Sequence, residues 1–285
     1  MNVIERKSLL NVGCGRTYHP AWVNIDVEPA SADVLRFDVS AGLPFPDATF
    51  EACYCSHMLE HLRRSEAARV VSEMHRVLRP GGKIRVVVPD LETLAQEYLR
   101  LLNALQGKDG AREADYDWIL LEMYDQAVRD RSGGDAARFL ADPGLSNREF
   151  VLARIGAEAE HAWQASRSPA AIRLWDRART RGLRWLIDNI RVRFAAALLG
   201  LFAGRSASSA YLEGVFRRSG EVHRWMYDAF SLGRVLHRAG FVNVRRCSAF
   251  ESGIAGFSSY ALDVDEKGRV RKPDSLFMEA EHPSA

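Results

Sequence analysis

The sequence of 285 residues lacks the features that mark secreted, membrane-spanning or nucleic-acid-binding proteins. It has only four cysteines, no Cys-x-x-Cys pair and no spacing typical of a disulfide framework. No apolar run reaches the ~18 residues of a spanning helix, and no long apolar stretch follows the charged residues near the start. The formal net charge is only +2, which does not indicate a nucleic-acid partner. We therefore expect a cytoplasmic protein without a signal peptide, a membrane span or a nucleic-acid partner.

An apolar run near the start of the chain ends in Gly-x-Gly. This segment, Leu9–Gly15, reads Leu-Leu-Asn-Val-Gly-Cys-Gly. A second apolar run, Trp22–Val27, contains a single acid, Asp26. This pattern predicts a strand, a tight turn and a second strand that carries a carboxylate at its C-terminal end. Such a carboxylate accepts hydrogen bonds from both hydroxyls of a ribose. Glycine is needed in the turn because a side chain would keep a ligand away from the backbone.

The spacing argues against a dinucleotide site. Tyr18 stands where a third glycine is expected, and Asp26 follows Gly13 by 13 residues where a dinucleotide fingerprint has about 20. No cradle for a pyrophosphate is visible. A cofactor with a ribose and no phosphates fits better, and S-adenosylmethionine is such a cofactor.

The first part of the chain predicts a parallel sheet. Ser65–Leu78 has apolar residues at helical spacing, with Ser65 as a candidate cap. Parallel strands joined by helices give a Rossmann-like, doubly wound, mostly parallel α/β sheet. Only residues 16–21 separate the glycine turn from the next strand, so the first helix must be short or replaced by a loop. The expected strands are 8–12, 22–26, 34–38, 50–56 and 82–88.

The middle of the chain loses the strand pattern. Residues 91–220 are rich in Ala, Leu, Arg and Glu and predict helices. We interpret them as a helical insertion, an acceptor lid or a dimerisation element, between the two parts of a core, 1–90 and 221–285. In the second part, 231–239 predicts a helix, and Phe241–Cys247 and Phe257–Val264 predict two strands that complete the sheet.

Five motifs follow one another along the first part of the chain: Leu10–Gly15, Asp26, Phe37–Val39, Leu43–Phe50 and Leu78–Gly82. Their order resembles that of the class I S-adenosylmethionine-dependent methyltransferases, and of a bacterial branch often associated with glycan or natural-product biosynthesis. The resemblance is strong over 8–90 and returns over 221–280. Residue pattern and resemblance together assign the S-adenosylmethionine site to Asn11, Gly13, Cys14, Gly15, Asp26, Val27, Asp38, Val39, Ser56 and His57.

The resemblance also implies where the catalytic groups lie, because the segment after the fourth strand faces the transferable methyl in this superfamily. His57 is the nearest candidate for a base that takes the acceptor's proton. It can instead cap the following helix or bond to its own loop. His223 and Tyr227 follow the insertion and are candidates for acceptor contacts, with His223 as an alternative base. Trp225 and Tyr227 can instead anchor the insertion on the core.

Two patterns raise the question of a metal, and we predict none. His57-x-x-Glu60-His61 is similar to a zinc-peptidase motif if all three side chains share a helical face. Cys53, Cys55 and His57 alternate onto one strand face. The methyltransferase order already explains the first pattern, and no third ligand is specified. We interpret the cysteines as small buried hydrophobic residues.

Seven arginines lie between Arg173 and Arg193 and are followed by the apolar run Phe194–Phe202. The run is too short to span a bilayer. Such a segment can form a core or homodimer helix, hold an anionic acceptor such as a nucleotide sugar, or lie on a membrane surface. The sequence leaves these three open.

The pattern as a whole predicts O-methylation of a small-molecule or sugar acceptor, because candidate bases exist. The Asn/Asp-Pro-Pro-Tyr/Phe signature used on amino groups of bases is absent after the fourth strand. Two alternatives stay open: N-methylation of a small amine, and a cofactor-binding regulatory or assembly subunit without transfer activity. The second rests on the short first crossover and on Asn11, where the family usually has an acid.

Overall fold

The computed structural model describes residues 7–107, 113–167 and 170–284, which fall into two compact units. The first unit contains the chain up to Leu99, a short piece Ala153–Gly156, and the chain from Arg224 onward. The second unit contains Arg100–Leu152 and Ala157–His223. The first unit holds the whole sheet, and the second is helical.

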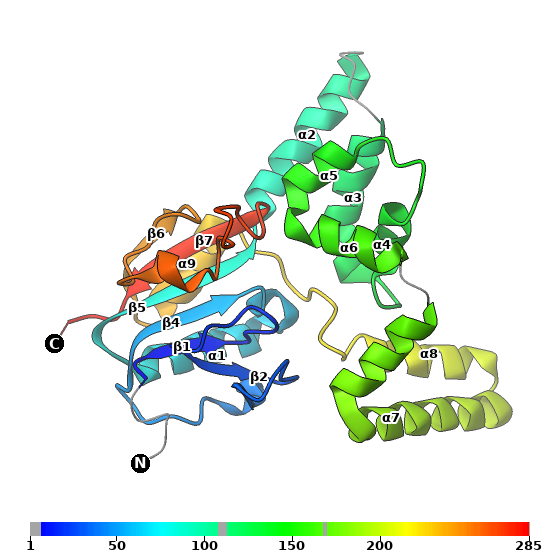
Figure 1. Ribbon diagram of the computed structural model, residues 1–285, viewed down its shortest axis with the longest axis horizontal. Helices are drawn as coiled ribbons and strands as arrows, with labels where there is room; N and C mark the ends of the chain where they lie inside the picture. The colour runs from blue at the N-terminus through cyan, green and yellow to red at the C-terminus, as the bar shows by residue number, and fades with distance from the viewer. Residues whose placement is uncertain (1–6, 108–112, 168–169, 285) are drawn as a thin grey trace. The chain divides into compact units, whose positions relative to one another are not determined.

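The sheet has seven strands in the order β3-β2-β1-β4-β5-β7-β6. The first five pair in parallel, whereas β7 is antiparallel to both of its neighbours. This strand order confirms the predicted Rossmann-like, doubly wound, mostly parallel sheet (Figure 1). The strands are β1 Leu9–Val12, β2 Val23–Asp26, β3 Val34–Arg36, β4 Phe50–Ser56, β5 Leu78–Pro89, β6 Val242–Cys247 and β7 Ser275–Glu281.

One face of the sheet is covered by two helices, α1 (Arg64–Val77) and α9 (Ala229–Arg238). Buried residues recur along α1 at spacings of three and four, as a helix that lies on a sheet requires. Ser65 does not cap α1. The helix begins after Arg63, whose amide donates to the Glu66 carboxylate at 2.9 Å, so the acid three residues later supplies the cap.

In the described part of the chain, the other face of the sheet is covered by the segment between β6 and β7. Trp22, Tyr54 and Phe277 pack there with buried residues of the segment between β6 and β7. The predicted strand Phe257–Val264 is wrong, because its apolar residues cover this face from a 3-10 turn, Phe257–Tyr260, and a loop. An apolar run of that length fits a strand or a buried cover equally well, and the last strand lies further on, in β7.

Arg85 on β5 fastens this covering segment to the sheet. The guanidinium is fully buried and donates to the Asp263 carboxylate at 2.6 Å and to Glu279 at 2.9 Å. It also donates to the carbonyls of Ser248 and Glu251. Burial raises the pKa of Asp263, and the Arg85 charge opposes that rise. The network therefore compensates a buried cation with two acids and two carbonyls.

The second unit and its borders are helical. Within the described residues, no helix is long and apolar enough to cross a membrane. The lid and dimerisation roles of the insertion stay predictions. The helices are α2 Leu91–Gly107, α3 Glu113–Val128, α4 Gly134–Leu140, α5 Arg148–Ile155, α6 Ala157–Arg167, α7 Ala170–Ala203 and α8 Arg205–Phe216.

Candidate active site

A cavity of about 210 Å³ opens at the carboxyl ends of β1 and β4, in the first unit. Ligands of open α/β sheets bind at this edge. Six of the residues predicted to form the cofactor site line it: Asn11, Gly13, Cys14, Gly15, Ser56 and His57. The remaining lining residues are Arg16, Thr17, Tyr54, Val87, Leu262, Asp263, Arg271, Lys272 and Phe277.

The two glycines of the turn have different reasons to be glycine. Gly13 has φ +67°, and a Cβ there would lie 2.5 Å from Cγ of Met58. Gly15 has φ +53°, but a Cβ there would meet no described atom within 4 Å. Packing and backbone conformation therefore both require glycine at 13. At 15 the space in front of the backbone is open, as a bound ligand needs.

Asp26 at the end of β2 is held by backbone amides on both sides. Its Oδ2 accepts from the Gly15 amide at 2.8 Å, and its Oδ1 accepts from the Glu28 amide at 2.8 Å. Each carboxylate oxygen has a second lone pair. The carboxylate is thus oriented beside the glycine turn, with acceptor capacity left for ribose hydroxyls.

Asn11 supplies an unsatisfied acceptor at the cavity wall. Its side chain is fully buried, and its Nδ2 donates to the carbonyl of Thr17 and to Oδ1 of Asn24. The bond to Thr17 ties Asn11 to the segment 16–21, which contains no helix. Of the two predicted alternatives for the first crossover, a short helix or a loop, the structure has the loop. The Oδ1 of Asn11 has no hydrogen-bond partner among the described residues. A buried carbonyl oxygen of this kind fits an ammonium group of a ligand.

Cys14 lies in the turn as a protonated thiol. Burial and the negative charge of Asp26 raise its pKa to about 12. The group is therefore neutral at physiological pH and acts through size and packing. Cys53 and Cys55 on β4 are fully buried in the sheet core, and burial raises the pKa of both thiols. This agrees with their predicted role as small hydrophobic residues.

His57 follows β4 and lines the cavity with both ring nitrogens engaged. Nδ1 lies 3.2 Å from Oε1 of the fully buried Glu60, and Nε2 lies 2.8 Å from the Ser275 hydroxyl. We assign the proton of a neutral ring to Nδ1, because the neighbouring carboxylate can accept a hydrogen bond but not donate one. Nε2 is then a hydrogen-bond acceptor and carries the basic lone pair. The ring orientation is thus set by Glu60 and Ser275.

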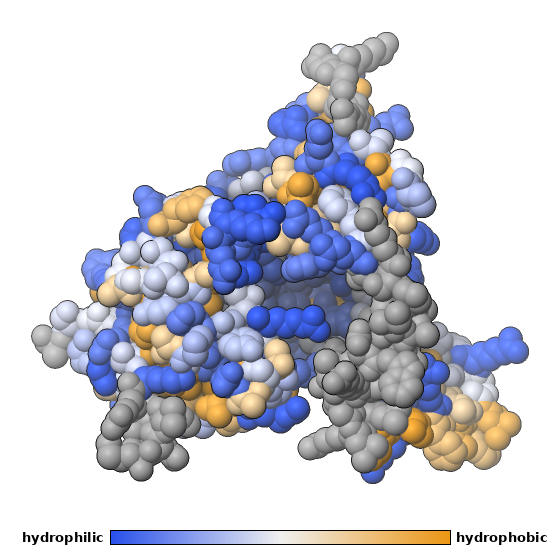
Figure 2. Space-filling view, in the orientation of Figure 1, coloured by the Kyte–Doolittle hydropathy of each residue, from blue (hydrophilic) through white to orange (hydrophobic). Residues whose placement is uncertain are grey.

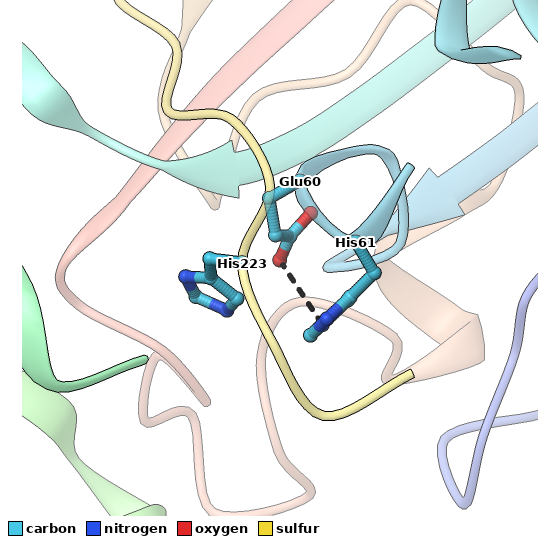
Figure 3. A group of neighbouring side chains, drawn as sticks. All are labelled: Glu60, His61 and His223. Carbon is cyan, nitrogen blue, oxygen red and sulfur yellow. Dashed lines mark ion pairs between the residues drawn. The ribbon is translucent and has the colours of Figure 1, made fainter. Parts of the chain in front are cut away.

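The zinc-peptidase-like spacing does not place two histidines on one helical face. His57 has φ +49°, outside the helical region, and a 3-10 turn, Leu59–His61, follows it. Oε1 of Glu60 lies 3.2 Å from Nδ1 of His57 and 4.0 Å from Nε2 of His61. Figure 3 shows the pair of Glu60 and His61. The same φ ends the predicted alternation of Cys53, Cys55 and His57 on one strand face, because the chain leaves the strand at His57.

The other predicted cofactor residues lie around Asp26 rather than in the cavity wall. Val27 is exposed next to it. Asp38 caps a short 3-10 turn, Val39–Ala41, with its carboxylate accepting from the Ser40 amide at 2.9 Å. Val39 packs against the sheet core. The adenine contacts predicted for Asp38 and Val39 stay a prediction, and the capping alternative is present in the structure.

The predicted acceptor-side residues lie apart from the cavity lining. Tyr227 is buried in the sheet core, and burial and Glu60 raise its pKa to about 12. It lines a different cavity, between α1 and α9. His223 is the last residue of the helical unit, where its amide donates to the carbonyl of Gln126. The catalytic roles of both stay predictions.

Sequence reasoning missed the groups that orient His57 and the cations at the cavity. Glu60 was read only as part of a metal motif, and Ser275 lies 218 residues from His57. Arg16, Arg271 and Lys272 line the cavity with one acid, Asp263, which pairs with Arg85. Basic residues were visible at these positions, but only the fold brings them together.

Comparison with known proteins agrees with this geometry. Residues 10–86 match the family model described as a methyltransferase domain. Over these residues the core is similar to a class I S-adenosylmethionine-dependent methyltransferase domain. The orphaned Asn11 oxygen, the open backbone at Gly15 and the oriented Asp26 carboxylate fit the ammonium and ribose groups of S-adenosylmethionine.

Relatives of the methyltransferase core are distant. A demethylmenaquinone methyltransferase of Listeria welshimeri is 27% identical over 42% of this chain and 51% of its own length. That of Geobacillus sp. WCH70 is 26% identical over 54% of this chain and 63% of its own length. The chain thus matches less than two thirds of either relative.

Among solved structures, a SAM-dependent methyltransferase of Archaeoglobus fulgidus has a TM-score of 0.36 and 10% identity, covering 98% of this chain and 87% of that one. The fold assignment rests on the strand order described above.

Proposed function

We propose that the protein transfers a methyl group from S-adenosylmethionine to an oxygen of a small-molecule or sugar acceptor. The observation that carries this proposal is the placement of an oriented histidine, His57, in the same cavity as the glycine turn. A base is most useful for a hydroxyl acceptor, whose proton must leave as the new bond to carbon forms. The family match of residues 10–86 supports the cofactor.

The residues of this chain have separate roles in the proposed reaction. Asp26 holds the ribose, and Asn11 holds the ammonium group of the cofactor's amino-acid end. The cofactor supplies an activated methyl on a positively charged sulfur. His57 takes the acceptor's proton on Nε2, and Glu60 stabilises the resulting imidazolium through Nδ1. Ser275 keeps the ring in place between turnovers. The enzyme mainly positions its two substrates, as in-line displacement requires.

The cofactor assignment is tested by titration calorimetry with S-adenosylhomocysteine. Asp26→Ala should weaken binding by about 10- to 100-fold, since two hydrogen bonds to a charged group are lost at 1.5–3 kcal/mol each, partly replaced by water. Asp33→Ala, an exposed acid in the loop before β3, should bind as the wild type does. Equal affinity in Asp26→Ala would remove Asp26 from the site.

The transfer itself is tested by S-adenosylhomocysteine formation with a panel of acceptors. The panel contains sugars, nucleotide sugars, small amines and a soluble demethylmenaquinol analogue, since both relatives are named for that acceptor. With an oxygen acceptor and saturating S-adenosylmethionine, His57→Ala should lower kcat by about 10²- to 10⁴-fold. His237→Ala on the exposed side of α9 is the matched control.

The same variants separate the competing functions. An amine that is already unprotonated needs no base, so near-normal turnover of an amine by His57→Ala would favour N-methylation. Tight binding of S-adenosylhomocysteine without turnover of any acceptor would favour a regulatory or assembly subunit. Full activity of His57→Ala on a hydroxyl acceptor would exclude the proposed base.

A further inference from the structure

The second unit exposes an apolar stripe along α7. Ile187, Ile190, Phe194, Leu198 and Leu201 follow one another at spacings of three and four residues, so they lie on one side of the helix. Their exposed fractions run from 40% to 76%, and Phe202 beside them reaches 83%. Single exposed apolar side chains are common on protein surfaces, but a continuous stripe indicates a contact surface.

The stripe is not the side on which α7 packs against α8. Ala196 is buried, and Val192 and Leu199 are partly buried. A Cβ added at Gly200 would lie 3.7 Å from Cβ of Ser208 on α8. These residues lie on the opposite side of α7 from Phe194 and Leu198, by helical geometry. One apolar side of α7 is therefore covered by α8, and the other side, the stripe, is exposed. Figure 2 shows hydrophobic side chains gathered at the hairpin end, where α7 passes into α8.

The hairpin is also strongly positive. Residues 170–220 contain ten arginines and three acids, a net charge of +7 in a chain of net charge +2, so the rest of the chain is net negative. The described arginines of the hairpin are exposed: Arg191, Arg193, Arg205, Arg217 and Arg218. Arg191 and Arg193 lie on α7 itself, one on each side of the stripe by helical geometry. The side chains of the remaining five, Arg173, Arg177, Arg179, Arg181 and Arg184, lie outside the described residues.

This charge decides between the occupants of the stripe. A second copy of the hairpin would bring together two segments of net charge +7 and would repel at close range. An anionic surface would be attracted by the same charges while it receives the apolar side chains. An apolar helix face with phenylalanine and leucine, flanked by arginine, is typical of helices that lie in a membrane interface.

We propose that the α7–α8 hairpin binds the surface of an anionic lipid membrane. The apolar stripe enters the boundary between headgroups and acyl chains, and the flanking arginines contact lipid phosphates. This inference concerns the hairpin only and does not depend on the acceptor or on the catalytic base. Its failure would leave the methyltransferase proposal unchanged.

The test is co-sedimentation of the full chain with vesicles. The wild type should bind vesicles that contain phosphatidylglycerol and should bind phosphatidylcholine vesicles much more weakly. Leu201→Gln/Phe202→Gln should lower the partition coefficient at least about tenfold, because two apolar side chains lose their burial. Arg191→Gln/Arg193→Gln should lower it by about thirtyfold at low salt, since each basic residue near the surface adds about fivefold.

Matched variants outside the hairpin control for charge and hydrophobicity. Phe250→Gln removes a 65% exposed phenylalanine from the first unit, and Arg234→Gln/Arg238→Gln removes two exposed arginines from α9. Both should bind vesicles as the wild type does. Circular dichroism and thermal melting of all variants should match the wild type, because the substituted side chains are exposed.

Three results would overturn the proposal. The first is no binding of the wild type to anionic vesicles, and the second is equal binding by the wild type and Leu201→Gln/Phe202→Gln. The third is a wild-type dimer, measured by light scattering, that the stripe variant dissociates in the absence of any vesicle binding. That result would assign the stripe to a second copy of the chain.

Discussion

At the scale of single residues, two neighbouring glycines separate folding from ligand binding. Gly13→Ala and Gly15→Ala both force a side chain into the left-handed region, at about 1–2 kcal/mol each. Only Gly13→Ala also drives a Cβ to 2.5 Å from Met58. We expect Gly13→Ala to lower the free energy of unfolding by more than about 3 kcal/mol, measured in urea. Gly15→Ala should lose less stability and weaken S-adenosylhomocysteine binding at least tenfold, by calorimetry.

Normal binding of S-adenosylhomocysteine by Gly15→Ala would show that the ligand does not occupy the space in front of Gly15. A larger loss of stability in Gly15→Ala than in Gly13→Ala would contradict the steric argument at Gly13.

A second residue-scale prediction concerns acid stability. The hydrogen bond from Arg76 lowers the pKa of Glu73 from 4.5 to about 2, and the Leu43 amide adds to the effect. Because the folded-state pKa lies below the unfolded one, the unfolded chain binds more protons between the two values. The stabilisation by Glu73 is therefore complete above about pH 4.5 and is lost as the pH falls toward about 2.

Glu73→Gln should accordingly lose stability relative to the wild type at pH 6, and the difference should shrink at pH 3. Urea midpoints of both proteins at the two pH values measure this difference, in which the titration of all other acids cancels. A difference that stayed constant or widened with acidification would contradict the assignment of the Arg76–Glu73 pair.

At the scale of elements, the cover of the sheet's second face depends on one buried ion network. Arg85→Met should lower the free energy of unfolding by about 3–5 kcal/mol, because Asp263 and Glu279 would be left buried without their shared cation. Arg245→Gln removes another partner of Glu279, but its side chain is half exposed, so the loss should stay below about 1 kcal/mol. Denaturant titration of both variants measures the contrast. Equal losses would show that burial of Arg85 does not matter.

The elements also show which parts of the fold local sequence determines. Strands β1 to β5 and helices α1 and α9 were predicted within a few residues, because short apolar runs alternate with turn residues and helical spacing. The segment 257–264 was predicted as a strand and forms a buried loop instead. This segment packs against Trp22 and Tyr54 and is bonded to Arg85 through Asp263. These partners lie far away in the sequence, so no local pattern indicates them.

The candidate site also contains residues that local sequence predicts and residues that it does not. Gly13, Gly15, Asp26 and the position of His57 follow from motifs and strand ends. Glu60 and Ser275 orient His57 from a turn and from the last strand, and their role depends on register between strands distant in sequence. The sequence shows the spacing of Glu60 to His57 and His61. Only the backbone conformation at His57 shows that the Glu60 carboxylate orients the His57 ring and does not belong to a helical metal motif.

At the scale of the whole molecule, the cofactor site and the helical unit are separate in the chain. Every residue that lines the cavity belongs to the first unit. S-adenosylhomocysteine alone should therefore slow amide hydrogen exchange in residues 11–17, 54–57 and 262–277, and it should leave α3, α4 and α6 unchanged. Binding stabilises only the part of the protein that it contacts or that unfolds together with it. The measurement is exchange followed by mass spectrometry, with and without saturating ligand.

The pattern of exchange then tests the role of the insertion. Unchanged exchange in the helices would agree with a core that binds the cofactor by itself and would leave the helical unit for the acceptor or the membrane. Strong protection of α3 or α6 by the cofactor product alone would mean that the helical unit completes the cofactor site. In that case the short loop 16–21, which replaces the first crossover helix, would have its missing wall supplied by the insertion, and Asn11 would face a helix as well as a ligand.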